Sequence, residues 1–239
     1  MLFGAAFRIV FRSLKDVWED AFQLALTNVV WLFLSIVGPI LAYLVWTYYP
    51  QPVLVWVSTI LALLSLPLAS SGMMHVTSRT AHGNAVHLSD LFAGIRRSFW
   101  ISWLWLLANL VVLALVYISL GFYTNLVQGP LEFLVGGFWL AVALVWIMMQ
   151  IYFWPLIVLQ TKINMIRAWR NAFILVVQEP LFAMILALAI FLLTGLCIIF
   201  SVAFMVAYMA IIGLIANNAT LYLLIRNGAI EAPRFELKM

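Results

Sequence analysis

The chain alternates long apolar stretches with short polar ones, and the apolar stretches have the length of membrane-spanning helices. A hydrocarbon core of about 30 Å takes roughly 20 helical residues to cross. From Leu181 to Ile225 there are 45 residues without a charge, which as one helix would be about 67 Å long. This stretch must therefore reverse once, and we place the turn between Ile198 and Ala203.

The pattern predicts six spans that pair into three helical hairpins, because the three turns that lie within the pairs carry no Lys or Arg. The turn at 49–52 contains two prolines, which prevent a helix from continuing. The predicted spans are 22–48, 53–77, 99–120, 133–160, 181–200 and 203–225. The predicted fold is all-α: a polytopic transmembrane helical bundle that forms a single membrane domain over residues 1–239.

Residues 1–20 have the pattern of an amphipathic helix. Apolar side chains recur at helical spacing at Phe3, Phe7, Phe11, Leu14 and Trp18. The segment also holds six charged residues, which are too costly to place in hydrocarbon. We therefore predict an interfacial helix that lies in the headgroup region.

A short motif recurs before the apolar stretches. WEDAFQLAL at 18–26 is echoed by WRNAFILVV at 169–177, and a weaker version runs from Ile95 to Ile101. The echoes predict three units, each an interfacial segment followed by a hairpin. Two interpretations stay open: an internal duplication, or the same choice of aromatic and small residues at every membrane entry.

Composition and charge agree with a membrane protein and set its orientation. Hydrophobic residues make up 67% of the chain and charged ones 8%, whereas soluble domains carry about a quarter charged residues. The twelve Lys and Arg fall in four groups of three, before the first span, between hairpins and after the last span. None lies in a hairpin turn. The positive-inside rule places both termini in the cytoplasm, with 226–239 as a cytoplasmic tail.

The sequence contains no recognisable catalytic arrangement. No charged residue lies within a predicted span, although coupled transporters usually carry such groups. The histidines His75, His82 and His87 are spaced seven and five residues apart, which matches no compact metal-binding motif. Protease, hydrolase and Walker motifs are missing as well. We expect no catalytic, cofactor or metal site, no enzymatic activity and no nucleic-acid partner.

Neutral polar residues inside the spans form a candidate intramembrane polar cluster. Its members are Asn28, Ser35, Asn109, Gln150, Asn217 and Asn218. They can hydrogen-bond between helices, each bond being worth about 0.6 to 2 kcal/mol. Alternatively, they line a cavity for a neutral or zwitterionic ligand.

The last span also carries small residues at helical spacing. The candidate packing face consists of Ala203, Ala207, Ala210 and Gly213. Small side chains allow close approach of a neighbouring helix. That neighbour is either inside the bundle or on a partner protein.

Three stretches resemble the YesL-like family of bacterial integral membrane proteins. They are Asn28 to Trp31, Pro67 to Phe99 with its Leu-Ser-Asp-Leu-Phe and Arg-Arg-Ser-Phe motifs, and Phe153 to Leu156 followed by Arg170 to Ala172. Family genes often neighbour those of sugar-uptake ABC transporters, so the resemblance implies a helper role in carbohydrate uptake. It also implies a multi-pass protein of the bacterial cytoplasmic membrane.

We therefore expect a non-enzymatic accessory or assembly subunit of a transporter or other membrane complex. Its expected partners are the lipid bilayer and other membrane-protein subunits. The alternative is a small permease, or a lipid or neutral-solute carrier with a polar site between the hairpins. A continuous cavity lined by Asn28, Asn109 and Gln150 would favour the carrier, and a dry bundle with an exposed small-residue face the accessory subunit.

The charge distribution predicts which loops face outside. In a Cys197→Ala background, single cysteines at Gln51, Gln128 and Ser201 should react with an impermeant thiol reagent added to intact spheroplasts. Cysteines at Gly83 and Asn164 should react only after the membrane is opened. Labelling at Gly83 from outside would overturn the orientation.

Overall fold

The computed structural model describes residues 2–126 and 130–230, which contain eight helices and no strand. The helices are α1 (Leu2–Glu19), α2 (Ala21–Tyr48), α3 (Pro52–Ala81), α4 (Leu88–Leu126), α5 (Pro130–Leu159), α6 (Met165–Gln178), α7 (Pro180–Ile199) and α8 (Ser201–Arg226). Six of them, all but α1 and α6, are long and apolar enough to span a membrane. The predicted all-α, six-span fold is confirmed, and the chain is a multi-pass membrane protein. Gln128, Gly129 and the tail beyond residue 230 lie outside the described residues.

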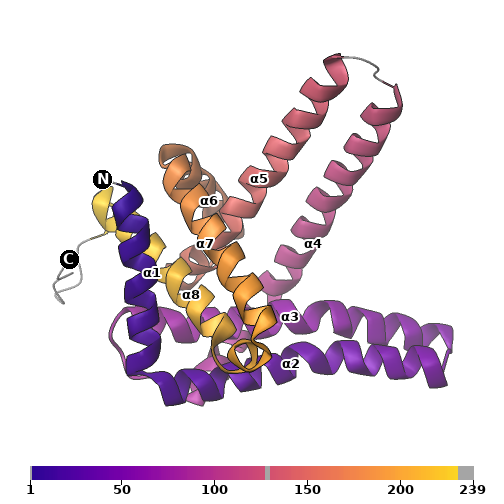
Figure 1. Ribbon diagram of the computed structural model, residues 1–239. Helices are drawn as coiled ribbons and strands as arrows, with labels where there is room; N and C mark the ends of the chain where they lie inside the picture. The colour runs from indigo at the N-terminus through magenta and orange to yellow at the C-terminus, as the bar shows by residue number, and fades with distance from the viewer. Residues whose placement is uncertain (1, 127–129, 231–239) are drawn as a thin grey trace.

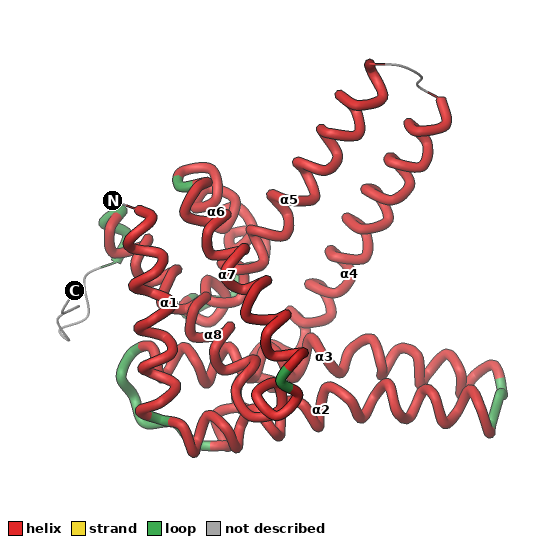
Figure 2. Tube along the Cα trace, in the orientation of Figure 1, coloured by secondary structure: helices red, strands yellow, loops and turns green. Residues whose placement is uncertain are grey.

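The six long helices form three hairpins around a common body (Figure 1). The α2/α3 and α4/α5 hairpins project from the body in different directions, while α1 and α6 lie beside α7 and α8. Short loops join most successive helices (Figure 2). The buried core lies in the body, where the second half of α5 meets α6, α7 and α8.

The helix boundaries correct one expectation and locate the last turn. α4 is continuous from Leu88 to Leu126, so the expected separate segment before the third span is wrong. No proline interrupts this stretch, and the helical hydrogen bonds therefore continue. The last reversal is at Phe200, between α7 and α8 and inside the expected interval.

The echoed motifs occupy different structural positions. The first, at 18–26, crosses the junction between α1 and α2, whereas the other, at 169–177, lies wholly inside α6. The corresponding tryptophans also differ. Trp18 is 82% exposed, and Trp169 stacks against Trp146 and Phe153 of α5, with centroid separations of 4.3 and 4.2 Å. The first and the last unit therefore differ in where the motif lies and in what its tryptophan contacts.

Helix α1 packs on the protein through small residues and leaves its aromatic residues outside. Ala5, Ala6 and Ser13 are buried against the body, where α1 contacts α7 and α8. Phe11 is 68% exposed, and Phe7 and Leu14 are exposed too. This outer face is available to lipid, as an interfacial helix requires.

Helices α2, α4 and α8 each approach α3 closely at a glycine. A Cβ added at Gly38 of α2 would lie 2.8 Å from the Leu61 carbonyl oxygen, and one at Gly94 of α4 would lie 3.0 Å from Gly72 Cα. At Gly213 of α8 the added atom would lie 2.6 Å from Thr77 Oγ1. Each crossing therefore depends on a missing side chain.

Pro39 leaves one carbonyl oxygen of α2 without its usual helical hydrogen bond, and α3 supplies the donor. Proline has no N–H to donate to the carbonyl four residues earlier, which here is that of Ser35. Ser65 Oγ of α3 donates to this oxygen at 3.0 Å. A carbonyl without a partner is costly in hydrocarbon, so this bond joins the two helices of the hairpin.

The Gly213 crossing yields a stability prediction with a matched control. Gly213→Leu should lower the thermal stability of the purified protein by about 1 to 3 kcal/mol, because the new side chain overlaps Thr77. Ala203→Leu adds bulk to the same helix at an exposed position and should leave the melting temperature unchanged. Equal melting temperatures for the two variants would contradict the crossing.

Candidate functional site

Asn28 connects α2 to the backbone of α8. Its Nδ2 donates to the Met205 carbonyl oxygen at 2.8 Å, and its Oδ1 accepts from the Met209 N–H at 2.8 Å. These are groups that a regular helix would pair with each other. Oδ1 also accepts from the Ala210 N–H at 3.2 Å, so the fully buried Asn28 is a structural link between the helices.

Asn109 and Gln150 hold α4 to α5 through a reciprocal arrangement with two tryptophans. Trp105 Nε1 donates to Gln150 Oε1 at 2.9 Å, and Trp146 Nε1 donates to Asn109 Oδ1 at 3.0 Å. Each amide group also donates to a carbonyl oxygen on its own helix. The paired Trp and amide side chains therefore satisfy one another inside the membrane.

The remaining polar residues connect other pairs of helices. Asn217 Nδ2 donates to Thr77 Oγ1 of α3 at 3.0 Å, and Asn218 links α8 to α1. Ser35 Oγ donates to the Trp31 carbonyl oxygen of its own helix at 2.8 Å. The candidate polar residues are thus distributed over several helix contacts and do not form one site.

The small-residue face of α8 is divided between the protein interior and the surface. Ala210 and Gly213 are buried, Ala207 is half-buried and Ala203 is exposed. The close approach at Gly213 is to α3 of the same chain. This half of the face packs inside the protein and therefore gives no support for a contact with a partner.

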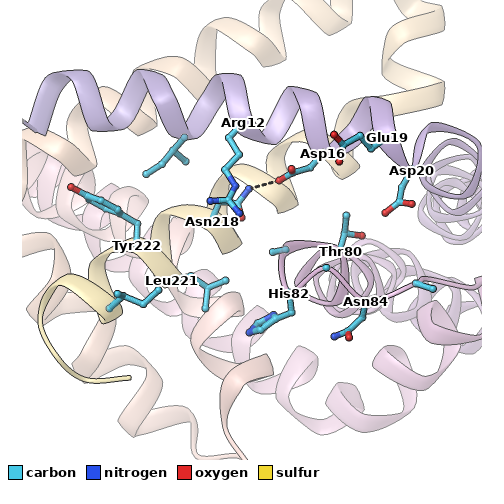
Figure 3. Close-up of a pocket in the computed structure, with 15 residues that line it drawn as sticks. Arg12, Asp16, Glu19, Asp20, Thr80, His82, Asn84, Asn218, Leu221 and Tyr222 are labelled. Atoms are coloured by element: carbon cyan, nitrogen blue, oxygen red, sulfur yellow. Dashed lines mark hydrogen bonds between the residues drawn. The ribbon is translucent and has the colours of Figure 1, made fainter. Parts of the chain in front are cut away.

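A cleft of about 540 Å³ lies between α1, the last turns of α8 and the loop that follows α3 (Figure 3). Its charged and titratable lining residues are Arg12, Asp16, Glu19, Asp20, His82 and Tyr222. Thr80, Asn84 and Asn218 add neutral polar groups, and Ile9, Leu221 and Ile225 form an apolar part. None of Asn28, Asn109 and Gln150 lines it.

The loop that closes the cleft is held by local bonds. Arg79 pairs with Asp90 at 3.2 Å, which ties the end of α3 to the start of α4. Asp90 Oδ2 accepts from the His87 N–H at 2.9 Å. Gly83 has φ of +71°, a conformation that glycine adopts without strain, and it allows the chain to turn immediately after α3.

Asp16 is the best-connected acidic residue of the cleft. Its Oδ2 accepts from Asn218 Nδ2 at 3.0 Å, and the same amide donates to Ser13 Oγ at 3.0 Å. Burial raises the pKa of the Asp16 carboxyl, while the Asn218 bond and the nearby Arg12 partly oppose that rise. The carboxylate is therefore held in a partly dehydrated position.

Two further charges in the cleft have no ion-pair partner among the described residues. Lys15 and Glu19 pair with each other at 3.5 Å, whereas Arg12 and Asp20 make no such contact. Within the described part of the chain, no three His, Cys, Asp or Glu side chains form a group that could hold a metal ion. The cleft therefore offers one cation, several carboxylates and amide groups to an organic ligand.

The sequence alone indicates only those lining residues of the cleft that come from the first helix and its end. Arg12, Asp16 and Asp20 are spaced four residues apart, so they share one face of the predicted helix. The contributions of Asn218 and the loop after α3 come from distant parts of the chain. No local pattern indicates that these segments meet.

Comparison of the chain with protein-family models, with curated proteins and with solved structures finds no match. The resemblance to the YesL-like family therefore stays a prediction.

The position of Asp16 predicts a pH-dependent stability. Because its pKa is higher in the folded state than in the unfolded one, the wild-type protein should gain stability relative to Asp16→Asn as the pH falls from neutral towards about 3.9. Asparagine keeps an oxygen that can accept from Asn218 but carries no charge. At neutral pH Asp16→Asn should melt at the higher temperature. A difference in melting temperature that does not change with pH would contradict the assignment.

Proposed function

We propose that this protein is a non-enzymatic accessory or assembly subunit of a transporter or another membrane complex. We further propose that it is a YesL-like protein of the bacterial cytoplasmic membrane, as the sequence resemblance implies. The observation that carries the accessory role is the exposure of α4.

Helix α4 is the least buried of the six candidate membrane spans in the described part of the chain. Only 6% of the residues in its most apolar stretch are buried, whereas the corresponding share is 50% in α5 and 67% in α8. Leu113 is 63% exposed, Tyr117 81% and Ile118 64%. These side chains meet either lipid or the helices of another protein.

The hydrogen bonds between α4 and α5 keep this exposed surface in place. The Trp105 and Asn109 side chains bond to α5, so they hold the two helices together without a partner. Leu113, Tyr117 and Ile118 lie further along α4 and are apolar or aromatic. In lipid, helices associate through van der Waals packing, and a hairpin with its own internal bonds can pack against another helix without rearranging.

The alternatives have less support. The three residues that would have lined a carrier cavity make helix–helix hydrogen bonds instead. The sequence carries no motif of a protease, hydrolase or ATPase, which supports a non-enzymatic role. One observation supports a ligand-binding function, namely the charged cleft beside α1.

Photocrosslinking in native membranes tests the proposed accessory role. Benzoylphenylalanine placed at Leu113 or Tyr117 should form an adduct with one other membrane protein. The matched control is Phe33 of α2, which is 66% exposed and should give no such adduct. Lipid adducts alone at all three positions, or the same protein adducts at all three, would contradict a partner at α4.

A further inference from the structure

The cleft beside α1 separates opposite charges along one helix face. Arg12 and Asp16 are four residues apart on α1, which corresponds to about 6 Å of helix axis. Asp20 follows directly after the end of α1. All three line the cleft (Figure 3). Neither Arg12 nor Asp20 has an ion-pair partner among the described residues. The cleft is therefore complementary to a ligand with an anionic and a cationic group one helical turn apart.

Two oxygen atoms favour a cationic group that donates hydrogen bonds. Asn218 is only 7% exposed and lines the cleft. Its amide nitrogen is used by Ser13 and Asp16, while its Oδ1 accepts no bond from the part of the chain that the structure describes. Asp16 Oδ1 likewise has no donor there. Neither oxygen is among the fully buried polar atoms without a partner in the described part of the chain, so both are open to a donor in the cleft. An ammonium group supplies three donors.

The apolar part of the cleft indicates where the ligand comes from. Leu221 and Ile225 lie in the last two turns of α8, where this candidate span ends. Ile9 adds an aliphatic side chain from α1, whose aromatic face is exposed. A ligand at this level can keep a charged headgroup in the cleft and its hydrocarbon in the membrane.

We propose that this cleft binds the phosphoethanolamine headgroup of a zwitterionic membrane phospholipid. The Arg12 guanidinium contacts the phosphate, because guanidinium forms strong charge-assisted bonds to phosphate. The ammonium, two carbons away, donates to Asp16 and to Asn218 Oδ1, with Asp20 nearby. Nothing in this assignment depends on a partner protein at α4.

Thermal unfolding of the full chain in an uncharged detergent measures the binding. Dioleoyl phosphatidylethanolamine should raise the melting temperature in a saturable way, because a ligand that binds only the folded state stabilises it. Phosphatidylglycerol, which has no ammonium, should bind at least about tenfold more weakly, a difference of about 1.4 kcal/mol. Phosphatidylcholine, whose ammonium has no N–H, should also be weaker. Equal responses to all three lipids would overturn the proposal.

Variants locate the binding within the cleft. Arg12→Gln and Asp16→Asn should each weaken the apparent affinity for phosphatidylethanolamine about tenfold. Arg8→Gln is the matched control for Arg12→Gln, because it removes one positive charge from the same helix outside the cleft. Its affinity should stay at the wild-type value. Because Asp16→Asn changes stability by itself, the comparison uses the lipid-dependent shift within each variant.

Soluble phosphoethanolamine distinguishes the two sources of the headgroup. If the lipid is the ligand, the free compound should compete at least about tenfold less well than the lipid, because it lacks the apolar contacts with Ile9 and Leu221. Competition at equal concentration would assign the cleft to a soluble zwitterion and overturn the lipid source. Affinities unchanged by Arg12→Gln and Asp16→Asn would place the lipid elsewhere and overturn the site.

Discussion

Close approach of neighbouring backbones to α3 sets how the helices of this protein pack together. Gly38, Gly94 and Gly213 bring α2, α4 and α8 against this helix. In lipid, apolar side chains gain little by leaving one hydrocarbon environment for another, so association depends on packing and hydrogen bonds. The position of α8 also places Asn217 and Asn218 opposite α3 and α1. The cleft is therefore a consequence of these crossings.

Hydrogen bonding explains how the polar residues inside the membrane are used. The Ser35 carbonyl, left without a donor by Pro39, is satisfied by Ser65, and Asn28 bonds to backbone groups of α8. Asn109 and Gln150 are occupied in the same way between α4 and α5. Because polar groups without partners are costly in hydrocarbon, these side chains maintain the fold.

The two functional proposals concern different parts of the molecule. The outer surface of α4 is apolar and suits another set of transmembrane helices, whereas the cleft lies among the charged residues of α1 and the loop after α3. Arg12 and Asp16 are far in sequence from Leu113 and Tyr117. A subunit of this kind can hold a lipid headgroup at one surface while it contacts a partner at another.

The six spans, their pairing into hairpins and the all-α class can be predicted from the amino-acid sequence, because span length, hydropathy and turn residues are local properties. The sequence also indicates the amphipathic α1, whose period is visible within twenty residues. That the small-residue face of α8 is half buried and that Asn28 bridges to Met209 could be seen only once the helices were packed together. The cleft depends in the same way on Asn218 meeting Ser13, 205 residues away along the chain. Hydropathy and spacing carry no information about such pairs, because each of these contacts is selected by how helices distant in sequence pack together.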